Sequence, residues 1–176
     1  SIDSQGQPDW TTIFLQNLPS TCSRQVVVDM LEWEGFAGSY DFVYVPVDIL
    51  TMTCSGNGFV NFRTHDVAAQ ALKQLDGYDR WRHSPGCCEV CRVSWSTFSQ
   101  GLAAHIERYR NSPVMHDKVA DICKPMLFER GVPVPFPAPT KRLRVPRIRG
   151  TKSMRGRGAH KGLQGSDRME YSEEKC

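Results

Sequence analysis

Apolar and polar positions alternate most clearly between residues 57 and 62, with a period of two. One side of an extended segment there carries residues typical of a sheet interior: Gly58, Val60 and Phe62. The other side carries an aromatic ring between two amides: Asn57, Phe59 and Asn61. Because successive side chains of a strand point to opposite faces, this pattern predicts a strand with one buried face and one face that offers a ring to a flat ligand.

The other segments follow either the two-residue period of strands or the period of helices. Apolar residues after Thr64 recur at i, i+3, i+4 and i+7, and both Thr64 and Ser23 are of the types that cap helices. The predicted elements are strand 12–17, helix 23–34, strand 40–47, the strand around Phe59, helix 64–75 and strand 89–95. This order predicts an α+β fold of the ferredoxin-like β-α-β-β-α-β type, with two helices on one face of an antiparallel sheet and the other face open.

An extension follows the predicted domain. Residues 99–110 have the pattern of a third helix, and the apolar residues at 124–128 are expected to dock the extension on the domain. From residue 131 the chain becomes Pro-rich and then Arg/Gly-rich, with too few apolar residues to offset the entropy of ordering. The expected organisation is a linker at 1–9, the domain at 10–98, a helix and docking segment at 99–129, and a disordered tail at 130–176.

Two short motifs lie on the first and third predicted strands. Residues 13–18, Ile-Phe-Leu-Gln-Asn-Leu, follow the pattern aliphatic, aromatic, aliphatic, any residue, Asn, Leu. Residues 55–62 follow an octamer of Gly and aromatic residues, with departures at Ser55 and Asn57. Together the motifs resemble the two signatures of the RNA-recognition motif (RRM), a domain that binds single-stranded RNA on its open sheet face.

Longer stretches are similar to one family of RNA-binding proteins. They lie at residues 34–36, 40–48, 58–62, 111–113 and 123–128. These stretches resemble the C-terminal RRM of the Mei2-like proteins over roughly residues 10–130, including an extension that most RRMs lack. The family typically has an aromatic residue where this chain has Asn57. The expected role is that of a post-transcriptional RNA regulator.

The candidate binding residues follow from strand parity on the open face. Aromatic rings there are expected to stack on bases, and polar side chains to contact base edges. The predicted RNA-binding residues are Phe14, Gln16, Tyr44, Asn57, Phe59, Asn61, Arg92 and Ser94. In the alternative, the helix at 99–110 folds across the sheet and buries Phe14 and Phe59.

Charge divides the chain into two parts. Residues 1–129 carry ten Lys and Arg against fifteen Asp and Glu, whereas residues 130–176 carry twelve against four. Such a basic tail is expected to bind phosphate without regard to sequence, through Arg142, Arg144, Arg147, Arg149, Arg155 and Arg157. A nuclear-localisation signal or a solubilising tail would have the same composition.

Other classes of function lack their motifs. There is no Gly-rich phosphate loop and no H-E-x-x-H, so neither an enzyme, a cofactor nor a small-molecule substrate is expected. The C-x-x-C of Cys88 and Cys91 has no second pair, so no metal site is expected. No apolar run approaches the ~20 residues of a membrane span. With seven cysteines and no secretory leader, free thiols in an intracellular compartment, nuclear or cytoplasmic, are expected.

A protein partner is the main alternative to RNA. Some RRMs cover their sheet and hold a peptide against a helix groove instead. The imperfect octamer, the acidic helix face of Asp29, Glu32 and Glu34, and the Arg80-Trp81 pair would suit this use. The Arg-x-Phe sequence typical of that subclass is absent.

Overall fold

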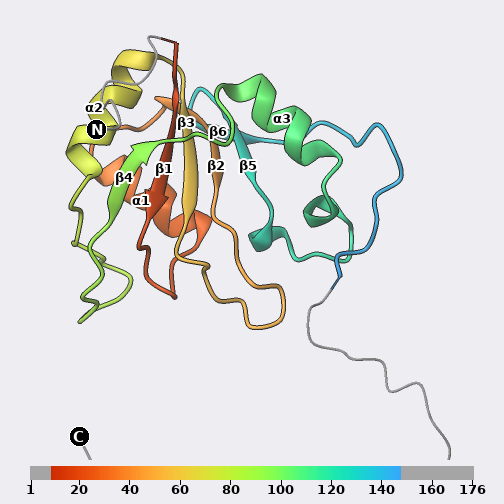
Figure 1. Cartoon of the computed structure of the whole chain (residues 1–176), viewed down its shortest axis with the longest axis horizontal. Helices are drawn as coiled ribbons and strands as arrows, with labels where there is room; N and C mark the ends of the chain where they lie inside the picture. Colours follow the sequence, from red (N-terminus) through yellow and green to blue (C-terminus); the bar gives the residue numbers. More distant parts are fainter. Residues whose placement is uncertain (1–8, 148–176) are drawn as a thin grey trace, which may run out of the picture.

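The computed structural model describes residues 9–147, whose strands form one antiparallel sheet (Figure 1). The elements are β1 (Thr12–Gln16), α1 (Arg24–Trp33), β2 (Tyr40–Tyr44), β3 (Gly58–Phe62), α2 (His65–Leu75), β4 (Arg92–Trp95), α3 (Leu102–Arg110), β5 (Met126–Glu129) and β6 (Val132–Val134). Two short 3-10 helices, η1 (Pro113–Met115) and η2 (Asp121–Cys123), connect α3 to β5. The strands lie in the order β4-β1-β3-β2-β5-β6. The predicted ferredoxin-like order of the first six elements is confirmed.

The main hydrophobic core lies between the sheet and helices α1 and α2. Ile13 of β1 pairs with Val60 of β3 and with Trp95 of β4, so a row of core residues crosses three strands. Gly58 also lies on this face, where a Cβ atom would be only 3.2 Å from the Leu18 Cδ1 atom. The alternation over residues 57–62 therefore predicted the buried face of β3 correctly.

Both predicted helix caps form. The Ser23 hydroxyl accepts a hydrogen bond from the Val26 N–H at 3.3 Å, and the Thr64 hydroxyl accepts one from the Val67 N–H at 3.4 Å. These bonds satisfy N–H groups that have no partner within the helix. The two caps thus determine the residues at which α1 and α2 begin.

Some element boundaries differ from the expected ones. β2 ends at Tyr44, and Val47 makes only an isolated bridge beyond it. β4 begins at Arg92, three residues later than expected. The register of β2 on β3 shifts between Tyr40 and Phe42, so Tyr40 joins the main core whereas Phe42 is buried on the opposite face.

The C-terminal extension enlarges the sheet. Leu127 of β5 pairs with Phe42 of β2, so the expected docking segment becomes a fifth strand. β6 pairs with β5 inside the region expected to be disordered, and that expectation fails for residues 132–134. Residues 1–8 of the expected linker and residues 148–176 of the expected tail lie outside the described residues.

Helix α3 packs on the sheet face opposite α1 and α2 (Figure 1). The Tyr109 ring of α3 lies 5.7 Å from the Phe42 ring, and Leu127 completes this second buried cluster. Because the cluster lies over β2 and β5, α3 covers that side of the sheet. It reaches β1 at Thr12, through His105, and the rest of β1 and β4 lie beside it. None of the helices within residues 9–147 is long and apolar enough to span a membrane.

Candidate RNA-binding surface

Four of the predicted binding residues form one row across the sheet. Phe14 of β1 is paired with Ser94 of β4 on one side and with Phe59 of β3 on the other. Phe59 is paired in turn with Tyr44 of β2. Strand parity alone predicted that these residues share a face, and the register shows that they are direct neighbours.

The centre of the row is a pair of stacked rings. The Phe14 and Phe59 ring centroids lie 4.9 Å apart with an interplanar angle of 28°, and both side chains are half-buried. Phe98, in the segment between β4 and α3, sets its ring edge-on to both, at 5.8 Å from Phe14 and 6.0 Å from Phe59. Phe98 is itself 62% exposed. Three rings thus form one apolar surface with an open side.

Phe98 was missed by the sequence argument. It lies outside every element with a clear period, so parity said nothing about its direction. The one available signal was an aromatic residue three positions beyond a strand that carries part of the face.

The β2 end of the row is closed by α3. The Tyr44 ring lies 4.7 Å from the Tyr109 ring at an angle of 60°, and burial raises the pKa of Tyr44 to about 12. Tyr44 therefore faces the expected side of the sheet, but its ring packs against protein. The alternative expectation was that the third helix buries Phe14 and Phe59. Both rings are half-buried, and Phe59 packs against the cluster under α3, whereas the ring that the helix covers is that of Tyr44.

Asn61 lies on the expected face of β3 but is 2% exposed and fully engaged. Its Oδ1 atom accepts hydrogen bonds from the hydroxyls of Thr11 and Thr12 at 2.8 and 2.7 Å. Its Nδ2 atom donates to the Asp41 carboxylate at 2.7 Å. A buried amide with these partners ties β1, β2 and β3 together, so the prediction that it contacts RNA does not fit its position.

His105 of α3 joins the same polar network. Its Nε2 atom lies 2.9 Å from the Thr12 Oγ1 atom. Because the Thr12 hydroxyl donates its proton to Asn61, it can only accept from His105, which requires the Nε2–H tautomer. The Nδ1 atom is then buried without a partner among the described residues, and burial lowers the pKa of His105 to about 4. The neutral imidazole holds α3 on the sheet.

Polar side chains flank the open rings. Gln16 of β1 and Arg92 of β4 are direct cross-strand partners, and both are exposed. Among residues 9–147, the Arg92 guanidinium has one ion-pair contact, a long one of 3.9 Å from its Nε atom to Asp76. Ser94 is exposed at the β4 end of the row, and the half-buried Asn57 directly precedes β3. These groups can donate to and accept from a base edge beside the rings.

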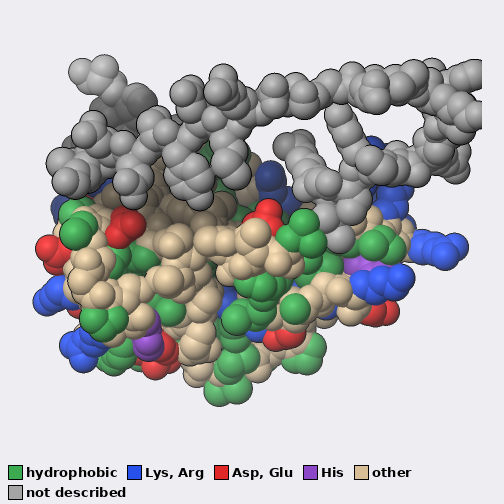
Figure 2. Space-filling view, turned by 90° about the horizontal axis from the view of Figure 1, so that it is seen from below, with side chains coloured by type: hydrophobic (Ala, Val, Ile, Leu, Met, Phe, Trp, Pro, Cys, Tyr) green, Lys and Arg blue, Asp and Glu red, His purple; other side chains and the backbone are tan. Residues whose placement is uncertain are grey.

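The predicted phosphate-binding residues are described only in part. Arg142, Arg144 and Arg147 are exposed. Arg149, Arg155 and Arg157 lie outside the described residues. Figure 2 shows several Lys and Arg side chains at the right-hand end of the molecule, where Figure 1 places the last described residues.

The features that favoured a protein partner are used within the domain. Glu34 pairs with Arg80 at 2.7 Å, and Asp29 lies 3.0 Å from His83. Trp81 is 5% exposed, and its Nε1–H donates to the Glu89 carbonyl at 2.7 Å. The loop before β4 therefore folds back on the acidic face of α1, with Trp81 as part of the core.

The cysteines of the C-x-x-C do not assemble a metal site. Cys88 is exposed, whereas Cys91 is fully buried in the main core. Within residues 9–147, no group of three or more His, Cys, Asp or Glu side chains is placed to hold a metal ion.

The fold and the aromatic row together define an RNA recognition motif. The family model described as RNA recognition motif matches residues 13–81. That segment of the chain belongs to the RNA recognition motif family, and β4 completes its sheet just beyond the matched residues. Because this is a family of binding domains, the match agrees with the prediction that the domain is not an enzyme.

More specifically, the chain is similar to Mei2-like proteins, as expected. It is 31% identical to Meiosis protein mei2 of Schizosaccharomyces pombe over 136 residues, which are 73% of this chain and 17% of that protein. It is 26% identical to Protein MEI2-like 3 of Oryza sativa over 76% of this chain and 14% of the relative. It is 25% identical to Protein MEI2-like 1 of Arabidopsis thaliana over the same shares. The chain thus spans less than a fifth of the length of these relatives.

Solved RRM structures also match. The second RRM of the yeast poly(U)-binding protein Pub1 gives a TM-score of 0.40 at 23% identity, and covers 52% of this chain and 99% of that one. The Rna15 RRM with bound RNA gives a TM-score of 0.43 at 20% identity, and covers 55% of this chain and 94% of that one.

Proposed function

We propose that this domain binds single-stranded RNA on the exposed part of its sheet, with bases stacked on Phe14, Phe59 and Phe98. The observation that carries the proposal is the apolar surface of three rings, which the fold holds at its surface rather than in its core. Phe98 and the open sides of the half-buried Phe14 and Phe59 rings are in contact with water, which is unfavourable for apolar surface, and a stacked base would remove that surface from water. Stacking contributes ~1–3 kcal/mol per base.

The boundaries of the surface suggest a short binding site. α3 occupies the Tyr44 end of the row, so bases have access to the β1, β3 and β4 part of the sheet. At ~1–3 kcal/mol for each of two stacked bases, the rings would supply about 2–6 kcal/mol. Gln16, Arg92, Ser94 and Asn57 would then discriminate between base edges, and the cations after residue 140 would add contacts to phosphate.

The biological role that fits this proposal is regulation of RNA inside the cell, in the nucleus or the cytoplasm. The similarity to Mei2-like proteins and the match to the RNA recognition motif support it. A peptide partner in place of RNA is less well supported, since the acidic face of α1 is already paired and Trp81 is buried.

The proposal is tested with Phe59→Ala and a matched control. Binding to single-stranded RNA of randomised sequence is measured by fluorescence anisotropy, and stability by thermal unfolding. Phe59→Ala should weaken binding by ~1–3 kcal/mol. The control is Trp33→Ala, because Trp33 is 43% exposed on α1, across the sheet from the ring surface, and its loss should leave affinity unchanged.

Two results would contradict the proposal. Equal losses of affinity for the Phe59 and Trp33 variants would show that RNA does not distinguish the two faces. A large loss of stability for Phe59→Ala with unchanged affinity would show that the ring supports the fold and not the RNA.

A further inference from the structure

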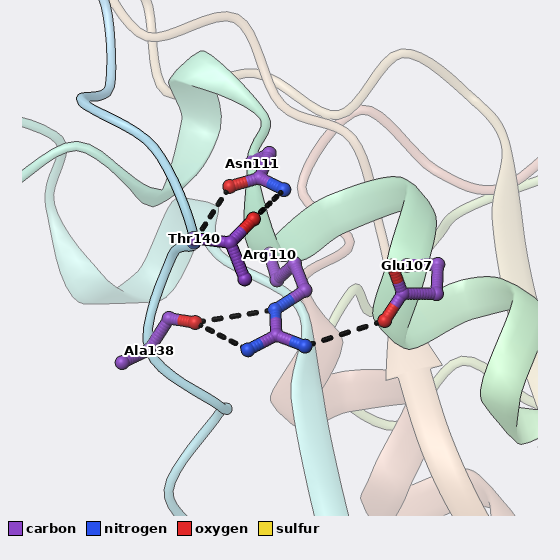
Figure 3. Close-up of polar contacts among 5 residues, drawn as sticks. All are labelled: Glu107, Arg110, Asn111, Ala138 and Thr140. Carbon is purple, nitrogen blue, oxygen red and sulfur yellow. Dashed lines mark hydrogen bonds and ion pairs between the residues drawn. The ribbon is translucent and has the colours of Figure 1, made fainter.

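The chain beyond β6 returns to α3 and is bound to its C-terminal end (Figure 3). The Asn111 side chain donates to the Thr140 hydroxyl at 2.9 Å and accepts from the Thr140 N–H at 3.0 Å. The preceding residue contributes as well: the Arg110 guanidinium donates twice to the Ala138 carbonyl, at 3.2 and 2.8 Å. Arg110 is itself oriented by Glu107, at 3.3 Å.

The other end of this segment is held by apolar contacts. Val134 and Phe136 pack against the second buried cluster, the one formed under α3. Between these anchors and the polar contacts, the sequence has Pro at every second position, 135, 137 and 139. Proline restricts the backbone to extended conformations, so residues 134–140 form a stiff segment that is fastened at both ends, here called the strap.

The segment that directly follows the strap, residues 141–147, is rich in cations. Lys141, Arg142, Arg144 and Arg147 are exposed, and within the described part of the chain none of the four takes part in an ion pair. The strap packs on the same sheet face as α3, which is also the face that carries Phe14 and Phe59. The first cations of the tail therefore begin at a defined place on the RNA side of the domain.

From this geometry we propose that the strap is a positioning device, which sets where the basic segment 141–147 meets the phosphate backbone of the same RNA strand that occupies the aromatic row. This inference rests on the proposed function. A second contact on the same chain gains affinity because the tether gives it a high effective concentration near the first. Release of the strap would lengthen the flexible tether, and the effective concentration would then fall. The attraction between a cation and a phosphate is also screened beyond about 8 Å at physiological salt, so the starting point of the cations matters.

The experiment releases the strap without changing any charge. Asn111→Ala removes both contacts with Thr140, whereas Thr140→Val removes only the contact to the hydroxyl, because valine keeps the backbone N–H. Gln70→Ala, which removes an exposed amide from α2, is the control. Affinity is measured in the full chain for oligouridylates of about 4 and about 16 nucleotides, lengths within the range that single-strand-binding domains occupy. Hydrogen exchange over residues 138–147 reports whether the strap has been released.

Release of the strap should weaken binding of the longer oligonucleotide about threefold to tenfold, as expected for a reduced effective concentration. It should leave binding of the shorter one unchanged. Thr140→Val should have at most the effect of Asn111→Ala, and combining it with Asn111→Ala should add nothing, because Asn111→Ala already removes both contacts. The effect should vanish when residues 141–176 are deleted, because no cations then remain to be positioned. If hydrogen exchange shows that Asn111→Ala leaves the strap in place, combining it with Phe136→Ala removes the apolar anchor as well.

The positioning role is overturned if release, confirmed by exchange, leaves the longer oligonucleotide bound as before, or if the weakening persists after deletion of the tail. Failure of the proposed function has a different signature. In that case Phe59→Ala would not weaken binding of the shorter oligonucleotide, whatever the strap variants do.

Discussion

Protonation of His105 should weaken the fold in mildly acidic solution. The imidazole is 2% exposed, stacks on the Phe42 ring at 4.3 Å, and donates from Nε2 to Thr12. A second proton would have to enter at Nδ1, which is buried and has no partner among the described residues. Burial, assisted by the charge of Arg108, therefore lowers the pKa of His105 from 6.5 to about 4.

Protonation of His105 destabilises the folded chain because the unfolded chain binds the proton at a higher pH. The unfolded chain takes up the proton as the pH falls below 6.5, whereas the folded chain resists it until about pH 4. Stability from this group is complete above pH 6.5 and is lost as the pH falls towards 4. For these two pKa values the loss is about 2 kcal/mol at pH 5 and about 3 kcal/mol at pH 4.

Urea unfolding between pH 7 and pH 5 measures this loss. His105→Gln removes this titration, so the comparison of the parent with the variant isolates the contribution of His105. The parent should therefore lose about 2 kcal/mol more than the variant between these two pH values. His83→Gln, which removes a surface imidazole that lies 3.0 Å from Asp29, should leave the difference in place. Parallel stability curves for the parent and His105→Gln would refute the assignment of a neutral, buried imidazole.

The remaining predictions concern RNA affinity. Asn57→Tyr should tighten RNA binding by up to ~1–3 kcal/mol and weaken base preference, because a ring stacks on any base whereas an amide discriminates between base edges. If neither affinity nor base preference changes, RNA does not bind at this position of the sheet. Arg142→Gln together with Arg144→Gln should lower the slope of log affinity against log salt by about 0.7 for each phosphate that the variant no longer neutralises, and an unchanged slope would show that these cations do not contact the strand.

The sequence predicted the parts of this structure that local patterns encode. Alternation over 57–62 and the two cap residues Ser23 and Thr64 determine strand faces and helix starts within a few residues, so the β-α-β-β-α-β order could be inferred. That Phe14 and Phe59 share the open face followed from the same parity, whereas their direct pairing is known only from the strand register. Local periodicity was enough for the scaffold and for the centre of the site.

Contacts between distant segments were beyond that reasoning. Asn61 is buried by Thr12 and by the approach of His105, which is 44 positions further along the chain, and Tyr44 is covered by Tyr109. β6 was missed for another reason. Its sequence contains Pro133, which lacks a donor, and such a residue is tolerated in a strand only because β6 lies at the edge of the sheet.

The closed and open parts of the sheet depend on one another. The Gln100 carboxamide accepts from the N–H groups of Thr11 and Thr12, both at 2.8 Å, and donates to the carbonyls of Thr12 and Ser96 at 2.9 and 2.8 Å. This one amide holds the segment 96–101 on β1, and that segment carries Phe98 towards the rings and leads into α3. The Thr12 hydroxyl in turn accepts a hydrogen bond from His105 of α3. The contacts that cover Tyr44 are thus continuous with those that place Phe98, and a change that loosens α3 should alter the exposed ring surface as well.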